Sequence, residues 1–204
     1  MPVFQRHEQP PAFTDYHAYK PYLRRDFLYR CAYCLLHEGD EPAGGFHSFH
    51  IDHFRPQKHF PLLGATYQNL YYACHWCNRA KWDTWPTQDE LKKGYEFVDP
   101  CQEDLYLMHS VIDRNTGRIE PRSKPGEFTI RNIKLNRPVF MQLRKRRFEA
   151  QREIEECAQK IASLIETADS DVRDKAALLQ EKIRLLDQKF INPKIPYEAA
   201  DLEE

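Results

Sequence analysis

The sequence predicts an α+β fold, and three patterns in different parts of the chain support this class. Residues 31–98 hold two C-x-x-C pairs on either side of the strand-like stretch "FHIDHF". Residues 105–123 alternate weakly between apolar and polar side chains around "NTG", which is typical of a turn between two strands. Beyond residue 136, apolar residues recur at spacings of four and three, which is typical of amphipathic helices.

The length and charge of the chain limit what it can be. Its 204 residues suffice for one domain with an appendage or for two small domains. The formal net charge of −1 neither favours nor excludes nucleic acid as a partner. Residues 121–147, however, contain nine Lys and Arg against one acidic residue, whereas residues 148–204 contain eight basic and fourteen acidic residues. The acidic end therefore offsets the charge of the basic middle in the net total.

No signal peptide or membrane-length apolar run is visible, so we expect a cytoplasmic protein without membrane contact.

Four regions follow from these patterns. Residues 1–30 are expected to form a loose arm, up to residue 12, and a short helix that ends near Arg30, with Pro21 as a break. Residues 31–98 carry all the notable spacings. Residues 99–135 are expected to connect this unit through a β-hairpin to a helical region, residues 136–204.

The helical region reads as two antiparallel helices. Asn136 is expected to cap the first helix, and Pro138 suits its first turn. A turn and a new cap are expected at residues 169–171, and Asn192-Pro193 should end the second helix. Each helix has one apolar stripe, so the two can pack as a hairpin; the stripes are Ala150, Ile154, Cys157, Ile161 and Leu164, then Val172, Ala176, Leu179, Ile183 and Leu186.

The two C-x-x-C pairs predict a metal site. Together they offer the four thiolates that structural zinc prefers, namely those of Cys31, Cys34, Cys74 and Cys77. Four buried thiols or a thiol–disulfide motif are the alternatives, and the second is disfavoured because neither pair lies in an evident βαβ unit. His37 and His75 are rival ligands. Cys101 and Cys157 stand apart, and Cys157 is expected in the core.

Within this pattern the chain resembles the HNH endonuclease family in its four-cysteine form. The residues that carry the resemblance are "CAYC", "HIDHFRP", "NLYYACHWCN" and the lysine that follows, Lys81, over residues 31–81. Over a wider range, up to about residue 147, the chain more loosely resembles HNH proteins that accompany an ATPase in Septu-type or retron-linked anti-phage defence.

The resemblance implies a ββα-metal unit that hydrolyses phosphodiester bonds. Asp52 would be a ligand of a catalytic Mg²⁺ or Mn²⁺ ion, and His53 the general base. Asn69 would orient the hairpin and the base. Asn78 would be the second oxygen ligand. Many members have histidine at this position, so the departure leaves open which metal is preferred. The resemblance also implies nucleic acid as substrate, with DNA favoured, and an ATPase as a partner protein.

The chemistry of these residue types agrees with that assignment. Histidine titrates near neutrality and can take a proton from water, and a hard divalent ion on oxygen ligands can neutralise a phosphate. Along a regular strand, the side chains of Asp52 and His53 would point to opposite faces. The strand must therefore end or bend there for both side chains to meet one phosphate. Pro56 suits such an ending. His50 is either an additional ligand, a supporting group or a structural histidine.

Several further residues are candidates for substrate contact. Arg55, Arg79 and Lys81 are expected to contact phosphates. The run "LRKRR", residues 143–147, is expected to bind the nucleic-acid backbone, with a solvated helix face as the alternative. The aromatic residues near the second cysteine pair are expected in the core rather than as platforms for bases: Tyr71, Tyr72, Trp76, Trp82 and Trp85.

Two other functions compete with DNA cleavage. One is a non-catalytic zinc module that docks nucleic acid or protein, although docking would need none of the four polar residues Asp52, His53, Asn69 and Asn78. The other is an RNase, because HNH chemistry does not exclude RNA, although no residue here is identified as a reader of a 2′-hydroxyl.

Overall fold

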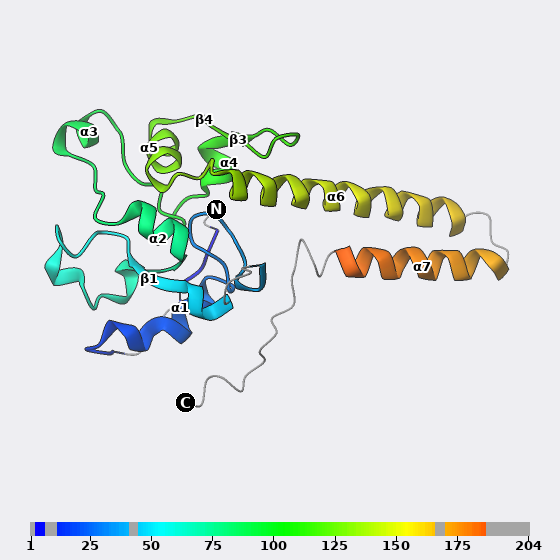
Figure 1. The fold of residues 1–204 in the computed structure, drawn as a ribbon, viewed down its shortest axis with the longest axis horizontal. Coiled ribbons are helices and arrows are strands. Elements are labelled where there is room, and N and C mark those ends of the chain that lie inside the picture. The colour runs from blue at the N-terminus through cyan, green and yellow to red at the C-terminus, as the bar shows by residue number, and fades with distance from the viewer. Residues whose placement is uncertain (1–2, 7–11, 41–44, 166–169, 187–204) are drawn as a thin grey trace.

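The computed structural model describes residues 3–6, 12–40, 45–165 and 170–186 (Figure 1). It confirms the α+β class, since short strands and helices form a body from which a long helical hairpin extends. The strands are β1 (Phe49–His53), β2 (Leu70–Cys74), β3 (Ser110–Ile112) and β4 (Ile119–Pro121). The helices are α1 (Lys20–Asp26), α2 (His75–Lys81), α3 (Gln88–Lys92), α4 (Leu105–Met108), α5 (Lys124–Ile133), α6 (Pro138–Ile165) and α7 (Ser170–Leu186).

Strands β1 and β2 and helix α2 form a compact ββα unit. The two strands pair antiparallel, with Phe49 opposite Cys74 and His53 opposite Leu70. All five residues of β2 are buried, so this strand lies inside the body rather than at its surface. Helix α2 begins directly after β2, which places the second cysteine pair at the junction of strand and helix. The predicted end of the first strand at His53 is therefore confirmed.

The second hairpin, β3–β4, supports the start of α6. Gly117 has φ +72° in the turn between the strands, and a Cβ there would lie 2.1 Å from the backbone oxygen of Met141. Only glycine allows this close approach. Arg144 of α6 donates from Nε to the Gly117 carbonyl oxygen at 2.6 Å and from Nη2 to the Leu135 oxygen at 2.8 Å. The hairpin predicted around residues 115–117 is thus confirmed, and its turn is an anchor for the long helix. The start of the predicted first strand, however, is helix α4 (Leu105–Met108).

The N-terminal segment differs from the expected loose arm. Phe4 is buried in the core, and its ring lies 4.9 Å from that of Phe27. The backbone N–H of Val3 donates to the Pro100 oxygen at 3.1 Å. Pro21 does not break the short helix but lies in its first turn, where a missing N–H costs nothing. The loose arm is therefore wrong for residues 3–6, because an aromatic side chain at position 4 finds a place in the core.

The helical hairpin is confirmed over the described residues. Helices α6 and α7 lie side by side (Figure 1), and Lys182 pairs with Glu153 across them at 3.6 Å. Cys157 and Ile161 of the predicted stripe are buried. The expected cap is wrong, because the Asn136 side chain pairs instead with the backbone of Ile119, accepting from its N–H and donating to its oxygen at 2.8 Å each.

Some predictions fall on residues outside the described part of the chain. These are Asp169 of the turn expected at residues 169–171 and the helix stop and tail within residues 187–204; Ser170 and Asp171 begin α7. Among the described helices, none combines the length and the apolar character needed to cross a membrane.

Candidate metal centre and active site

The four predicted cysteines converge on one point inside the ββα unit. Their sulfur atoms all lie within 4.8 Å of one another, and all four residues are buried. The sulfurs of Cys34 and Cys74, one from each pair, are 3.7 Å apart. A tetrahedral zinc ion with Zn–S bonds of about 2.3 Å places its sulfurs about 3.8 Å apart. The geometry therefore fits a structural zinc ion.

The electrostatics of this cluster also fit a cation. Burial and the neighbouring thiols raise the pKa of Cys34 and Cys77 well above the ordinary value. Burial also opposes ionisation of Cys31, but hydrogen bonds from the other three thiols lower its pKa. A divalent ion at the centre would stabilise all four sulfurs as thiolates. The rival histidines lie elsewhere, since His37 accepts a hydrogen bond from the Gly39 N–H at 3.0 Å and His75 is exposed.

A second group of polar side chains lines a hollow of about 150 Å³ at the surface of the same unit. Asp52 and His53 reach it from the end of β1, and Asn78 reaches it from α2. The strand ends at His53, so neighbouring side chains that leave the backbone in different directions still meet at one hollow. Asp83, which the sequence analysis did not single out, adds another carboxylate to its wall.

Asp52 is held in place by two buried donors. The hydroxyl of Tyr33 donates to Oδ2, and the ammonium of Lys81 lies 3.0 Å from Oδ2 and 3.2 Å from Oδ1. Burial and the nearby carboxylate raise the pKa of Tyr33 well above its ordinary value, so its hydroxyl remains a donor. A carboxylate offers about four acceptor positions, and these contacts occupy three. One position therefore remains for a cation.

Lys81 does not have the position that phosphate contact requires. It is fully buried at 0% exposure, and its ammonium also donates to the backbone oxygen of His53 at 2.6 Å. The expected phosphate contact is therefore wrong for Lys81. Its charge serves instead to fix Asp52 and the end of β1.

His53 is oriented by a backbone carbonyl. Its Nε2 lies 2.9 Å from the Gly64 oxygen, and because a carbonyl only accepts, Nε2 carries the proton. In the neutral ring Nδ1 then has a free lone pair. Burial lowers the pKa of His53, against the smaller opposing effects of the Gly64 oxygen and Asp52. The ring is thus neutral near pH 7 and can accept a proton at Nδ1.

Asn69 holds the loop that supplies this carbonyl. Its amide nitrogen donates to the backbone oxygens of Arg55 at 3.0 Å and Leu63 at 3.3 Å, and its oxygen accepts from the Arg55 N–H at 2.8 Å. Leu63 directly precedes Gly64, so Asn69 ties the start of the loop at Arg55 to the turn that presents the Gly64 carbonyl. Asn69 lies outside the hollow of Asp52 and acts on it only through this loop.

The donor set of the hollow is suited to a hard divalent ion. The Asn78 side chain makes no hydrogen bond to any described residue, although it lines the hollow, so its amide oxygen is available as a ligand. Asp52 supplies a carboxylate oxygen beside it. Oxygen ligands of this kind suit Mg²⁺ or Mn²⁺.

Comparison with known families identifies this part of the chain. Residues 31–84 match the model described as HNH endonuclease. This segment is therefore similar to HNH endonucleases, and we call residues 31–84 the HNH unit. It includes all four clustered cysteines and every residue of the hollow. Comparisons with curated proteins and with solved structures give no match.

Three other predicted residues lie away from the centre of the HNH unit. His50 is exposed, and its ring lies 5.7 Å from that of His75 rather than in the hollow. Arg55 and Arg79 are exposed, and neither lines the hollow of His53. Contact of these two arginines with a substrate stays a prediction.

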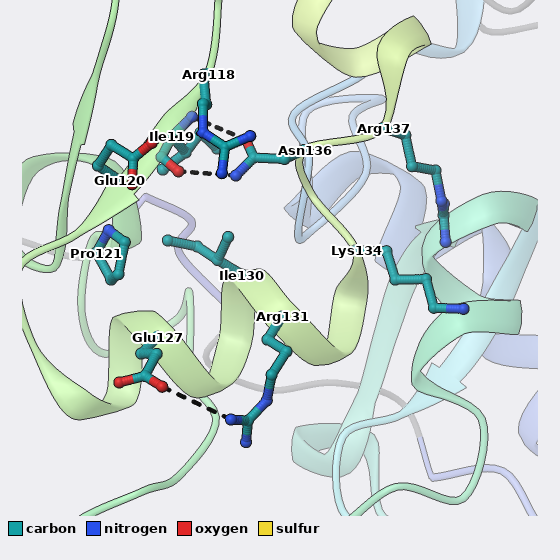
Figure 2. A pocket seen from close by; sticks show the side chains of 10 residues that line it. All are labelled: Arg118, Ile119, Glu120, Pro121, Glu127, Ile130, Arg131, Lys134, Asn136 and Arg137. Atoms are coloured by element: carbon teal, nitrogen blue, oxygen red, sulfur yellow. Dashed lines mark hydrogen bonds and ion pairs between the residues drawn. The ribbon is translucent and has the colours of Figure 1, made fainter.

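Two arginines of the basic run 143–147 are committed to structure, whereas Lys145 and Arg146 of the same run are exposed. Arg144 is buried, and Arg147 donates to the Leu35 oxygen at 3.1 Å and to Asp40 at 3.3 Å. Backbone binding by the run 143–147 is therefore wrong for these two arginines, because they tie α6 to the body. Upstream, Arg131 pairs with Glu127 at 3.6 Å in a separate hollow of about 410 Å³ (Figure 2).

Besides Asp83, sequence reasoning missed two features of the HNH unit. It did not predict that Tyr33, between the first two cysteines, would bond to Asp52, and only the folded contact reveals this link. It also placed Trp82 in the core, whereas 72% of this residue is exposed at the wall of the hollow. The other corrected aromatic residue is Trp76, which is 46% exposed.

Proposed function

We propose that the HNH unit is the catalytic centre of a metal-dependent endonuclease that hydrolyses phosphodiester bonds, with DNA as the favoured substrate. One observation carries the proposal. Asp52, His53 and Asn78 come from β1 and α2, yet they line one hollow, and His53 presents an unprotonated Nδ1. A module that only docked nucleic acid would need no such arrangement.

The residues have distinct roles in this proposal. His53 accepts the proton of the attacking water at Nδ1 while the Gly64 carbonyl holds the ring from the other side. Asp52 and Asn78 would hold the Mg²⁺ or Mn²⁺ ion. When bound, that ion would neutralise the phosphate and the leaving oxygen. Lys81 and Tyr33 keep Asp52 in position, and Asn69 keeps the loop of Gly64 in position.

The test is cleavage of supercoiled plasmid by the purified full chain with Mg²⁺, Mn²⁺ or a chelator. We expect His53→Ala and Asp52→Ala each to reduce cleavage by about 100-fold or more, the range for loss of a positioned acid–base group. Asn78→Ala should raise the metal concentration needed, and Asn78→His should change the preferred metal.

The matched control is His50→Ala, which removes an exposed histidine from the same strand but outside the hollow. It should cleave like the unaltered chain. Full cleavage by His53→Ala would disprove the assignment of the base. Cleavage of RNA but not DNA by the unaltered chain would replace the favoured substrate with the alternative one.

The finer role rests on the resemblance alone. We place the nuclease in anti-phage defence with an ATPase partner because the looser likeness, up to about residue 147, is to ATPase-linked HNH proteins. The helical hairpin offers a surface for such a partner, since α6 and α7 extend beyond the body that holds the HNH unit (Figure 1).

A further inference from the structure

Trp82 differs from the other two tryptophans of the HNH region. Trp85 packs among aromatic rings, with Phe60 at 5.2 Å and Phe54 at 5.9 Å. Trp76 lies edge-on to His75 at 5.7 Å. The indole of Trp82, in contrast, has neither a ring nor a cation partner among the described residues, and 72% of the residue is exposed. Packing therefore does not explain why a tryptophan stands here.

The backbone at Trp82 also argues against a role in folding. Its φ of 44° and ψ of −130° lie in a left-handed region that favours glycine. Bulky residues persist in such conformations only where the surroundings fix them, and such positions gather at functional sites. The neighbours do fix this one, since Trp82 N–H donates to the Asn78 oxygen at 2.9 Å and His59 Nε2 lies 3.1 Å from the Asp83 oxygen.

The location of the indole indicates what it contacts. Trp82 lines the same hollow as His53 and Asn78, so a phosphate bound there would bring the adjoining nucleotide to the indole. An exposed indole provides a flat apolar face, and bases stack on such faces regardless of sequence. In the interior of a perfect duplex both faces of each base are already covered by neighbouring base pairs. Only an unpaired, unstacked base can lie on Trp82.

We propose that Trp82 stacks on an unpaired base beside the cleaved phosphate, so that the HNH unit favours single-stranded or locally opened nucleic acid over perfect duplex. This inference rests on the proposed function for the position of the phosphate. It assigns Trp82 to substrate recognition and names the class of substrate.

The test measures binding separately from cleavage. The probe is a fluorescently labelled oligodeoxynucleotide offered to the His53→Ala chain as a single strand, as a perfect duplex and as a duplex with one mismatch. We expect the single strand and the mismatched duplex to bind more tightly than the perfect duplex. Trp82→Ala should weaken the binding of the single strand and of the mismatched duplex by about tenfold, which is the usual loss for one stacked base. It should leave the binding of the perfect duplex unchanged.

Three variants complete the design. Trp82→Phe should retain most of the preference, because a phenyl ring still stacks. Trp76→Ala, which removes an exposed tryptophan outside the hollow, should change nothing. Trp82→Gly should lose the preference without lowering the unfolding temperature, because glycine suits this backbone conformation.

The proposal would be overturned if Trp82→Ala weakened the binding of all three probes equally, or if it weakened the binding of none. The outcomes also separate the two inferences. If the unaltered chain cleaves no nucleic acid while Trp82→Ala still abolishes the preference, the proposed function fails and the stacking role stands. If plasmid is cleaved but Trp82→Ala binds all three probes as before, the proposed function stands and the stacking role fails.

Discussion

The cysteine cluster and the hollow of His53 lie in the same HNH unit, yet they have opposite relations to solvent. All four cysteines are buried and face one another. At the hollow, His53 and Asn78 are half-buried, and Asn78 has an uncommitted side chain among the described residues. Structural metal sites are closed by protein ligands, whereas catalytic sites keep a position open. This difference supports the proposed division of roles, in which one site stabilises the fold and the other carries the chemistry.

The two sites are nevertheless built on shared pieces of chain. Tyr33 lies between Cys31 and Cys34 and donates to Asp52, and Asn78 directly follows Cys77. A metal that fixed the cysteines would therefore also fix groups at the hollow. Changes at each site should separate the two roles and reveal where they are coupled.

The largest effect is expected at the closed site. Cys74→Ser should remove zinc and unfold the chain, because binding of structural zinc contributes about 10–16 kcal/mol of folding free energy in small domains. Elemental analysis and circular dichroism measure both consequences. Cys101→Ser is the control, since Cys101 lies outside the cluster and burial raises its pKa to about 11, which keeps it an inert thiol. Folded Cys74→Ser protein without zinc would contradict the prediction.

A smaller effect is expected where the two sites are coupled. Tyr33→Phe removes the buried hydrogen bond to Asp52 but keeps the ring. A hydrogen bond to a charged group contributes about 1.5–3 kcal/mol, so the Mg²⁺ or Mn²⁺ concentration for half-maximal cleavage should rise about tenfold or more. Zinc content should remain unchanged.

The matched control for this coupling is Tyr72→Phe. It removes a similar buried hydrogen bond, from Tyr72 to Glu38 at 2.7 Å, outside the hollow. This variant should lower the free energy of unfolding without changing the metal dependence of cleavage. An equal change of metal dependence in both variants would show that Tyr33 acts through general stability alone.

The smallest effect on both sites is expected from loss of the second helix. A chain truncated after about residue 169 keeps the HNH unit and the residues that anchor α6, Arg144 and Arg147. Its zinc content and plasmid cleavage should match those of the full chain. Under the proposed defence role it should lose its ATPase partner in a pull-down. Retained binding would make the hairpin a scaffold only.

The sequence by itself predicted the cysteine cluster, the end of β1, the turn at Gly117 and the two long helices, but not helices α3, α4 and α5. The paired C-x-x-C spacing predicted the cysteine cluster, because two such pairs together offer four thiolates to one tetrahedral metal ion. Strand-like character followed by proline predicted that β1 ends near His53, and apolar steps of four and three predicted α6 and α7. These signals are local, since each depends on backbone geometry over a few residues.

Tertiary structure alone decided where the charged and aromatic side chains lie. Lys81, Arg144 and Arg147 look like phosphate ligands in sequence, but partners distant along the chain draw them inward: Asp52 lies 29 positions from Lys81, and Leu35 lies 112 positions from Arg147. Trp82 looks like a core residue, but the backbone at the end of α2 turns it outward. A long polar side chain can reach either solvent or a buried acceptor, and only the assembled fold supplies the acceptor.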